Sequence, residues 1–142
     1  MNLTAHLRVT AELHGVSIVN QPGYTEDARA WIIRRIVKIG TIDSERDYLV
    51  ALHELGHIVL QHEPDRCEGV THRVLREELE AWKWALAHKR CALTQTGVSE
   101  IKVCLNSYVM AATGQPHRAV RAFLEQLKPD TWETAGPRGR LP

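Results

Sequence analysis

The sequence predicts an α+β fold that is mostly helical, with a small β-sheet near the N-terminus. The chain has 142 residues, which is the length of one domain. Two segments dense in β-branched residues lie within residues 1–40, and the rest of the chain repeats apolar residues at helical spacing. We therefore expect a single domain over residues 1–128. Residues 129–142 are rich in Pro and Gly, which predicts a flexible C-terminal tail.

The N-terminal segments give one helix signal and two strand signals. Residues 3–13 (LTAHLRVTAEL) repeat leucines near helical spacing, and His14 and Gly15 follow as a stop. Residues 16–20 (VSIVN) are β-branched and precede the turn signal QPG, which indicates a strand. Residues 30–40 (AWIIRRIVKIG) would also suit a helix, but their density of β-branched side chains favours a strand.

Four helical segments follow these strands. Asp43 and Ser44 offer N-caps to a periodic apolar pattern that runs from Tyr48 to Leu60 and ends before Pro64. The motif HELGH lies in the middle of this helix. The other three helices are expected over residues 71–93, 98–112 and 116–127.

Composition and charge exclude several classes of protein. The formal net charge of +1 gives no reason to expect nucleic acid as a partner. Cys67, Cys91 and Cys104 are odd in number and widely spaced, so they fit neither a disulfide framework nor a paired CxxC zinc site. The N-terminus has no apolar leader segment, and no window approaches 18 apolar residues. We expect a cytoplasmic protein that does not enter a membrane.

The motif HELGH at residues 53–57 has the spacing of a metal site. Positions four apart on a helix share a face, so His53 and His57 can bind one ion, with Glu54 beside them. This arrangement suits hydrolysis by a zinc-activated water, whose pKa the metal lowers toward ~7 while the carboxylate takes its proton. The alternative is an ordinary packed helix with two histidines. Apolar flanks favour the metal site, because buried imidazoles need partners.

A catalytic zinc ion typically takes three protein ligands, so a third has to come from outside the motif. His62 suits better the role of a cation near the helix C-terminus. In the helix expected over 71–93, Glu78 falls on the flank of the apolar stripe. Glu77 and Glu80 point toward the far side and are expected to be solvated. Glu78 is therefore the better candidate.

HELGH, with Glu78 in the stretch ELEAWKWA 21 positions after His57, resembles the gluzincin pattern. It is similar in particular to the small members, the minigluzincins and the ImmA/IrrE-type peptidase domains, over residues 28–90. The resemblance implies a zincin-like fold, zinc held by His53, His57 and Glu78, and Glu54 as general base. It implies a zinc metallopeptidase, an endopeptidase, with a peptide or protein as its substrate.

Two further expectations come from the same resemblance. These families carry an edge strand before the active-site helix, which supports the strand over 30–40 and implies that it pairs with an extended substrate. Many gluzincins place Asp or Asn four residues after the ligand glutamate to orient a zinc histidine. This chain has Trp82 there, so a different residue has to hold that imidazole.

Tyr108 and His117, from the C-terminal helices, are the candidates for a transition-state donor, and a structural role is the alternative for each. Two other functions stay open for the whole chain. One is a zinc-containing regulatory or binding module with little proteolytic turnover. The other is a structural protein in which HELGH is merely packed.

Overall fold

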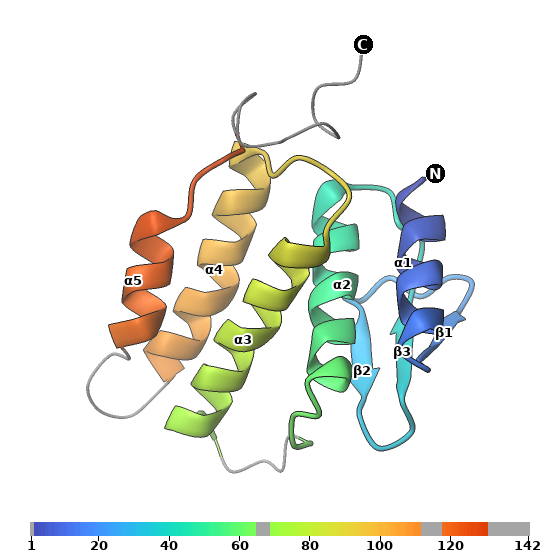
Figure 1. Cartoon of the computed structure of the whole chain (residues 1–142), viewed down its shortest axis with the longest axis horizontal. Helices are drawn as coiled ribbons and strands as arrows, with labels where there is room; N and C mark the ends of the chain where they lie inside the picture. The colour runs from blue at the N-terminus through green and yellow to red at the C-terminus, as the bar shows by residue number, and fades with distance from the viewer. Residues whose placement is uncertain (1, 65–68, 112–117, 131–142) are drawn as a thin grey trace. The chain divides into compact units, whose positions relative to one another are not determined.

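The computed structural model describes residues 2–64, 69–111 and 118–130 (Figure 1). Over these residues the fold is α+β and mostly helical, with a small sheet near the N-terminus, as the sequence predicts. In chain order the elements are α1 (Leu3–Leu13), β1 (Ser17–Asn20), β2 (Arg29–Trp31), β3 (Ile36–Ile39), α2 (Glu45–Val59), α3 (His72–His88), α4 (Gln95–Ala111) and α5 (Arg118–Gln126).

The described residues group into two compact units. The first comprises the residues up to Pro64 together with Glu80–Lys89, and so contains α1, the sheet, α2 and the second half of α3. The second comprises the first half of α3, α4, α5 and the segments that join them. The single domain over residues 1–128 stays a prediction.

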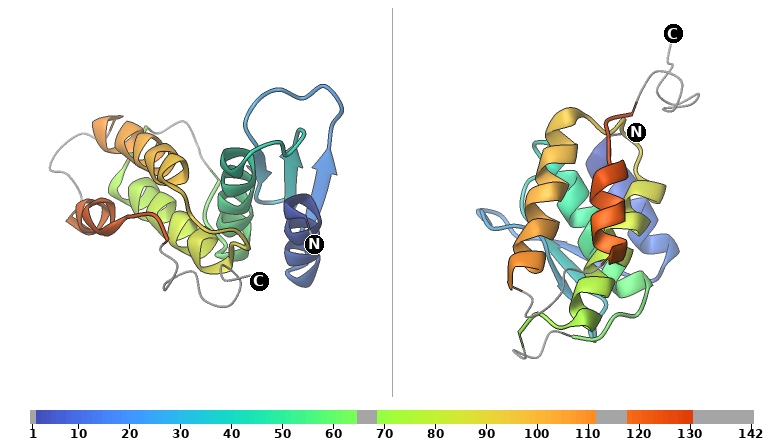
Figure 2. Two further views of the ribbon diagram at one scale, coloured as in Figure 1. Left: turned by 90° about the horizontal axis from the view of Figure 1, so that it is seen from above. Right: turned by 90° about the vertical axis from the view of Figure 1, so that its left-hand side faces the viewer.

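In the first unit, α1 and α2 cover one face of a three-stranded sheet (Figures 1 and 2). The strand order is β1-β3-β2, with β1 parallel and β2 antiparallel to β3. Val37 and Ile39 of the central strand are buried, while their neighbours Ile36 and Lys38 are half-buried. This alternation is expected for a strand with one face against the core.

The single strand predicted over residues 30–40 is wrong, because the segment forms a hairpin of β2 and β3. The chain turns between them, with Arg35 in the left-handed region at a φ of 53° and its N–H donating to Ile32 O at 3.1 Å. The Arg35 side chain donates to the carbonyls of His14 (2.5 Å) and Gly15 (3.3 Å) just after α1. These tertiary bonds support a turn that the local sequence does not signal.

Helix α2 begins and ends with well-formed caps. The Ser44 side chain accepts a hydrogen bond from the N–H of Asp47 at 3.1 Å, as its predicted N-cap role requires. At the other end Gln61 takes a φ of 58°, and the N–H groups of Gln61 and His62 donate to Ile58 O and His57 O, both at 3.0 Å. This pair of bonds is a Schellman turn, which reverses the chain and returns His62 toward the helix.

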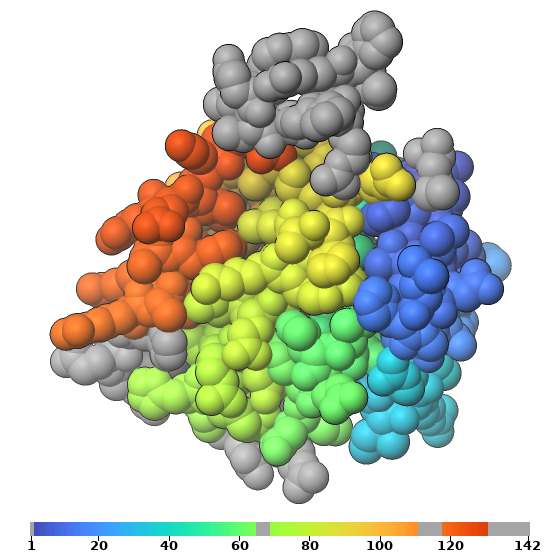
Figure 3. All heavy atoms as spheres, in the orientation of Figure 1, coloured from blue at the N-terminus to red at the C-terminus, as the bar shows by residue number. Residues whose placement is uncertain are grey.

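Helix α2 is buried on nearly every side, and the second half of α3 packs closely against it. A Cβ atom added at Gly56 would lie 3.1 Å from Cε3 of Trp84 and 3.2 Å from the carbonyl oxygen of Ala81. Glycine is therefore the residue that lets the α3 backbone come this close. Side chains of α1 and of the last turn of α2 reach the face drawn in Figure 3, in blue and green.

In the second unit, α4 and α5 contribute the buried residues Val98, Ile101, Leu105 and Val120. Two hydrogen bonds, one to a side chain and one to the backbone, join Asp130 at the end of the described chain to Leu93. The N–H of Leu93 donates to the Asp130 carboxylate, and the N–H of Asp130 donates to Leu93 O, both at 2.8 Å. Of the predicted C-terminal tail, residues 131–142 lie outside the described residues.

We expect Gly56→Val to lower the free energy of unfolding by about 1–3 kcal/mol, because its branched side chain would press on Trp84 and on the Ala81 carbonyl. Urea denaturation measures this loss. Ala87→Val, at an exposed position of α3, is the control and should cost less than about 0.7 kcal/mol. Equal losses in the two variants would show that the helix contact at Gly56 tolerates a side chain.

Candidate metal centre

His53 and His57 lie one turn apart on α2 and are both buried. Their side chains share one face of the helix, with ring centroids 4.6 Å apart and the rings nearly perpendicular. His53 is 5% exposed and His57 is 8% exposed. The sequence prediction that these two imidazoles lie together in the core is confirmed.

Glu78 of α3 joins the two histidines. Glu78 is 7% exposed, and one possible ligand atom from each of His53, His57 and Glu78 lies within 4.8 Å of the others. Two imidazoles and a carboxylate, all buried, form a group that could hold a metal ion.

Glu54 lies beside the group and contacts the edge strand β2. Its Oε2 accepts a hydrogen bond from the backbone N–H of Ala30 at 3.0 Å, and its Oε1 lies 3.5 Å from Nδ1 of His53. The Glu54 side chain is 22% exposed and thus partly open to solvent. A carboxylate next to a metal group, partly open to water, can accept a proton from a reacting water.

The segment that leads into β2 is tied to α2. Arg46 donates two hydrogen bonds to the Asp27 carboxylate, at 2.6 and 3.0 Å. The hydrogen bond from Arg46 lowers the pKa of the Asp27 carboxyl, so the pair stays charged near neutral pH. This fork of bonds helps hold β2 beside Glu54.

Trp82 occupies the position where the gluzincin pattern has Asp or Asn, and it contacts His53 by stacking. The ring centroids of His53 and Trp82 are 4.2 Å apart, with an angle of 22° between the planes. The indole therefore restricts the His53 ring by packing and not by a hydrogen bond to its nitrogen.

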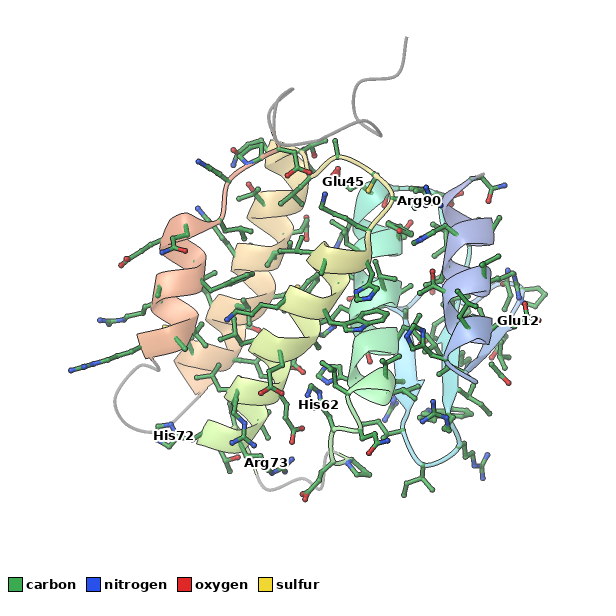
Figure 4. The ribbon with its side chains drawn as sticks, viewed as in Figure 1. Glu12, Glu45, His62, His72, Arg73 and Arg90 are labelled. Carbon is green, nitrogen blue, oxygen red and sulfur yellow. The ribbon has the colours of Figure 1, made fainter. Side chains whose placement is uncertain are left out.

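The sequence interpretation of His62 as a cation near the helix end stays a prediction, but the structure gives this residue contacts that the sequence did not suggest. His62 is buried, at 6% exposure, and its Nδ1 lies 2.8 Å from Nδ1 of His57. Its Nε2 lies 2.9 Å from Oε2 of Glu80. Figure 4 shows His62 just beyond the C-terminal end of α2. His62 follows His57 by five residues, and the Schellman turn between them brings the two rings together. Helical phase alone does not predict this contact, because the helix ends before His62.

The prediction that Glu77 is solvated is wrong. Glu77 is 8% exposed and accepts a hydrogen bond from Arg73 at 3.0 Å. Figure 4 labels Arg73 near the start of α3. Glu80 is exposed, as predicted, but it contacts His62. Residues 77–79 are all buried, so α3 buries a wider arc than the single apolar stripe suggested.

The roles of Tyr108 and His117 as candidate transition-state donors stay predictions. Tyr108 is half-buried on α4, in the second unit. His117 lies outside the described residues.

Comparison of the chain with protein-family models, curated proteins and solved structures finds no match. Within the described ranges, no helix is long and apolar enough to cross a membrane.

We expect Zn²⁺ or Co²⁺ to raise the melting temperature of metal-free protein and to bind at about one ion per chain, because binding to the folded state alone stabilises it. At a free metal concentration 100-fold above the Kd, the free energy of unfolding should rise by about 2.7 kcal/mol. Glu78→Gln should lose this response, since the amide is a poor ligand. Glu77→Gln, on the same buried face, is the control. A metal-dependent shift of equal size in both variants would exclude Glu78 as a ligand.

Proposed function

We propose that the protein is a zinc metallopeptidase of the gluzincin type, which hydrolyses peptide bonds in a peptide or protein substrate. The observation that carries this proposal is the buried group of His53, His57 and Glu78 with the Glu54 carboxylate directly beside it. Two imidazoles and one carboxylate are a common donor set of catalytic zinc, and they leave a fourth position open. The sequence resemblance to minigluzincins supports the same assignment.

The residues of the site divide the chemistry between them. Zinc, when bound, lowers the pKa of a water molecule and polarises the scissile carbonyl. Glu54 takes a proton from the attacking water and passes it to the departing amine nitrogen as the carbon–nitrogen bond breaks. The hydrogen bond from Ala30 holds the carboxylate in place without adding a charge to it.

The edge strand β2 supports a peptide as the substrate. β2 pairs with β3 along one edge, and its Ala30 N–H reaches Glu54. An extended peptide that adds to the outer edge of β2 would bring its backbone next to this carboxylate. The sequence expected a strand over residues 30–40 to pair with the substrate. We now propose that β2, at Arg29–Trp31, is the strand that does so.

A zinc-containing regulatory or binding module with little turnover is the second candidate. The hydrogen bond from Ala30 favours it, because this bond engages one of the two carboxylate oxygens that a general base uses. Both candidate functions predict a bound zinc ion, but only the peptidase predicts hydrolysis of peptide bonds. An assay on an unfolded protein such as casein separates them.

Glu54→Gln should abolish hydrolysis of casein by zinc-loaded protein while keeping the fold and about one zinc per chain. The amide oxygen can still accept the bond from Ala30, but it cannot take a proton from water. Release of acid-soluble peptides measures the rate, and Glu63→Gln at an exposed position is the control.

A Glu54→Gln variant that cleaves as fast as the parent would exclude Glu54 as the base. A zinc-loaded parent that leaves unfolded proteins intact would favour the regulatory module.

A further inference from the structure

We propose that Glu80 and His62 are positioning residues that fix His57 as a metal ligand through a chain of two hydrogen bonds. This role presupposes the metal site proposed above and adds residues that lie outside the HELGH motif and its partner glutamate. The chain runs from the Glu80 carboxylate to Nε2 of His62 at 2.9 Å, and from Nδ1 of His62 to Nδ1 of His57 at 2.8 Å.

The chemistry of the partners sets the proton positions along this chain. An ionised carboxylate only accepts hydrogen bonds, so Nε2 of His62 carries the hydrogen that faces Glu80. In its neutral form His62 then has a lone pair on Nδ1, which can accept from the Nδ1–H of His57. The remaining lone pair of His57 lies on Nε2. One exposed carboxylate thereby selects the tautomer in which His57 offers Nε2 to an ion.

The backbone holds the two imidazoles in this relation. The N–H of His62 donates to the carbonyl of His57 at 3.0 Å, within the Schellman turn that Gln61 makes at a φ of 58°. His57 and His62 are therefore joined twice, once through the backbone and once through their rings. Because His62 is 6% exposed, water competes little for the bond between the rings.

The hydrogen-bonded chain from Glu80 to His57 supplies a residue that orients a histidine in place of the usual Asp or Asn at position 82. In the gluzincin pattern a single Asp or Asn at that position orients a zinc histidine, whereas here the indole stacks on His53. His57 is oriented instead by His62 and, through it, by Glu80. Removing partners of this kind from a metal ligand typically weakens metal binding by about 10–100-fold.

Zinc affinity, measured by competition with a chelator, tests the Glu80 end of the chain. Glu80→Gln keeps an acceptor opposite His62 and should weaken zinc binding by less than about 10-fold. Glu80→Lys offers only donors, which turns His62 to the other tautomer and leaves two N–H groups facing each other. We expect a loss of about 10–100-fold. Glu63→Lys makes the same change of charge at a neighbouring exposed position and is the matched control.

The His62 end has its own pair of variants. His62→Phe keeps a ring but removes the acceptor, and should also weaken zinc binding by about 10–100-fold. Asn places Oδ1 the same number of bonds from Cα as Nδ1 of histidine, so His62→Asn should recover part of the affinity. The absorption spectrum of the Co²⁺-loaded protein should shift in His62→Phe and stay close to that of the parent in His62→Asn.

Melting of the metal-free variants separates positioning from folding. A positioning role predicts that zinc affinity falls further in Glu80→Lys than in Glu80→Gln and in Glu63→Lys, while the metal-free melting temperatures stay together. Equal zinc affinity in all variants, with a parent that binds zinc, would overturn the positioning role and leave the metal site standing. A parent that binds no zinc would overturn both. A parent that binds zinc without hydrolysing casein would remove the peptidase function alone.

Discussion

The need to give partners to polar side chains inside the core governs this structure. Helix α2 is buried on nearly every side and still carries His53, Glu54 and His57. A polar group taken from water without a partner costs roughly 2–7 kcal/mol, depending on the reference state. The edge strand donates a hydrogen bond to Glu54, the turn after α2 brings His62 against His57, and Trp82 of α3 stacks on the His53 ring.

Close packing of two helices is the means by which α3 supplies its share. Glycine inside a helix costs about 1 kcal/mol relative to alanine, and Gly56 lies well inside α2. Because it has no side chain, the backbone of α3 can lie against α2 at Ala81, where Trp82 stacks on His53. The same helix carries Glu78, which lies with the two histidines, and Glu80, which contacts His62.

Glu54 joins α2 to the edge strand, because its carboxylate accepts a hydrogen bond from the Ala30 N–H of β2. Its side chain stays 22% exposed. Under the proposed function, a peptide that pairs with β2 would lie beside this carboxylate. The fork of bonds between Arg46 and Asp27 ties the preceding segment to the same helix.

Sequence alone determined the features that depend on local spacing. Helical periodicity gave the fold class and the helix α1 at Leu3–Leu13, and the four-residue spacing placed His53 and His57 on one face. Helical phase, together with the resemblance to gluzincins, pointed to Glu78, although the same phase wrongly sent Glu77 to solvent. The histidine pair was predictable because neighbours along one helix face meet whatever the rest of the chain does.

Only the tertiary structure decided the features that depend on where a chain turns. The hairpin between β2 and β3 needs Arg35 in the left-handed region, supported by carbonyls at the end of α1, and the stretch IIRR contains no turn signal. Likewise the Schellman turn at Gln61 brought His62 back to His57, and packing buried Glu77. Periodicity describes a helix while it continues, whereas these contacts form where an element ends or where a second element covers it.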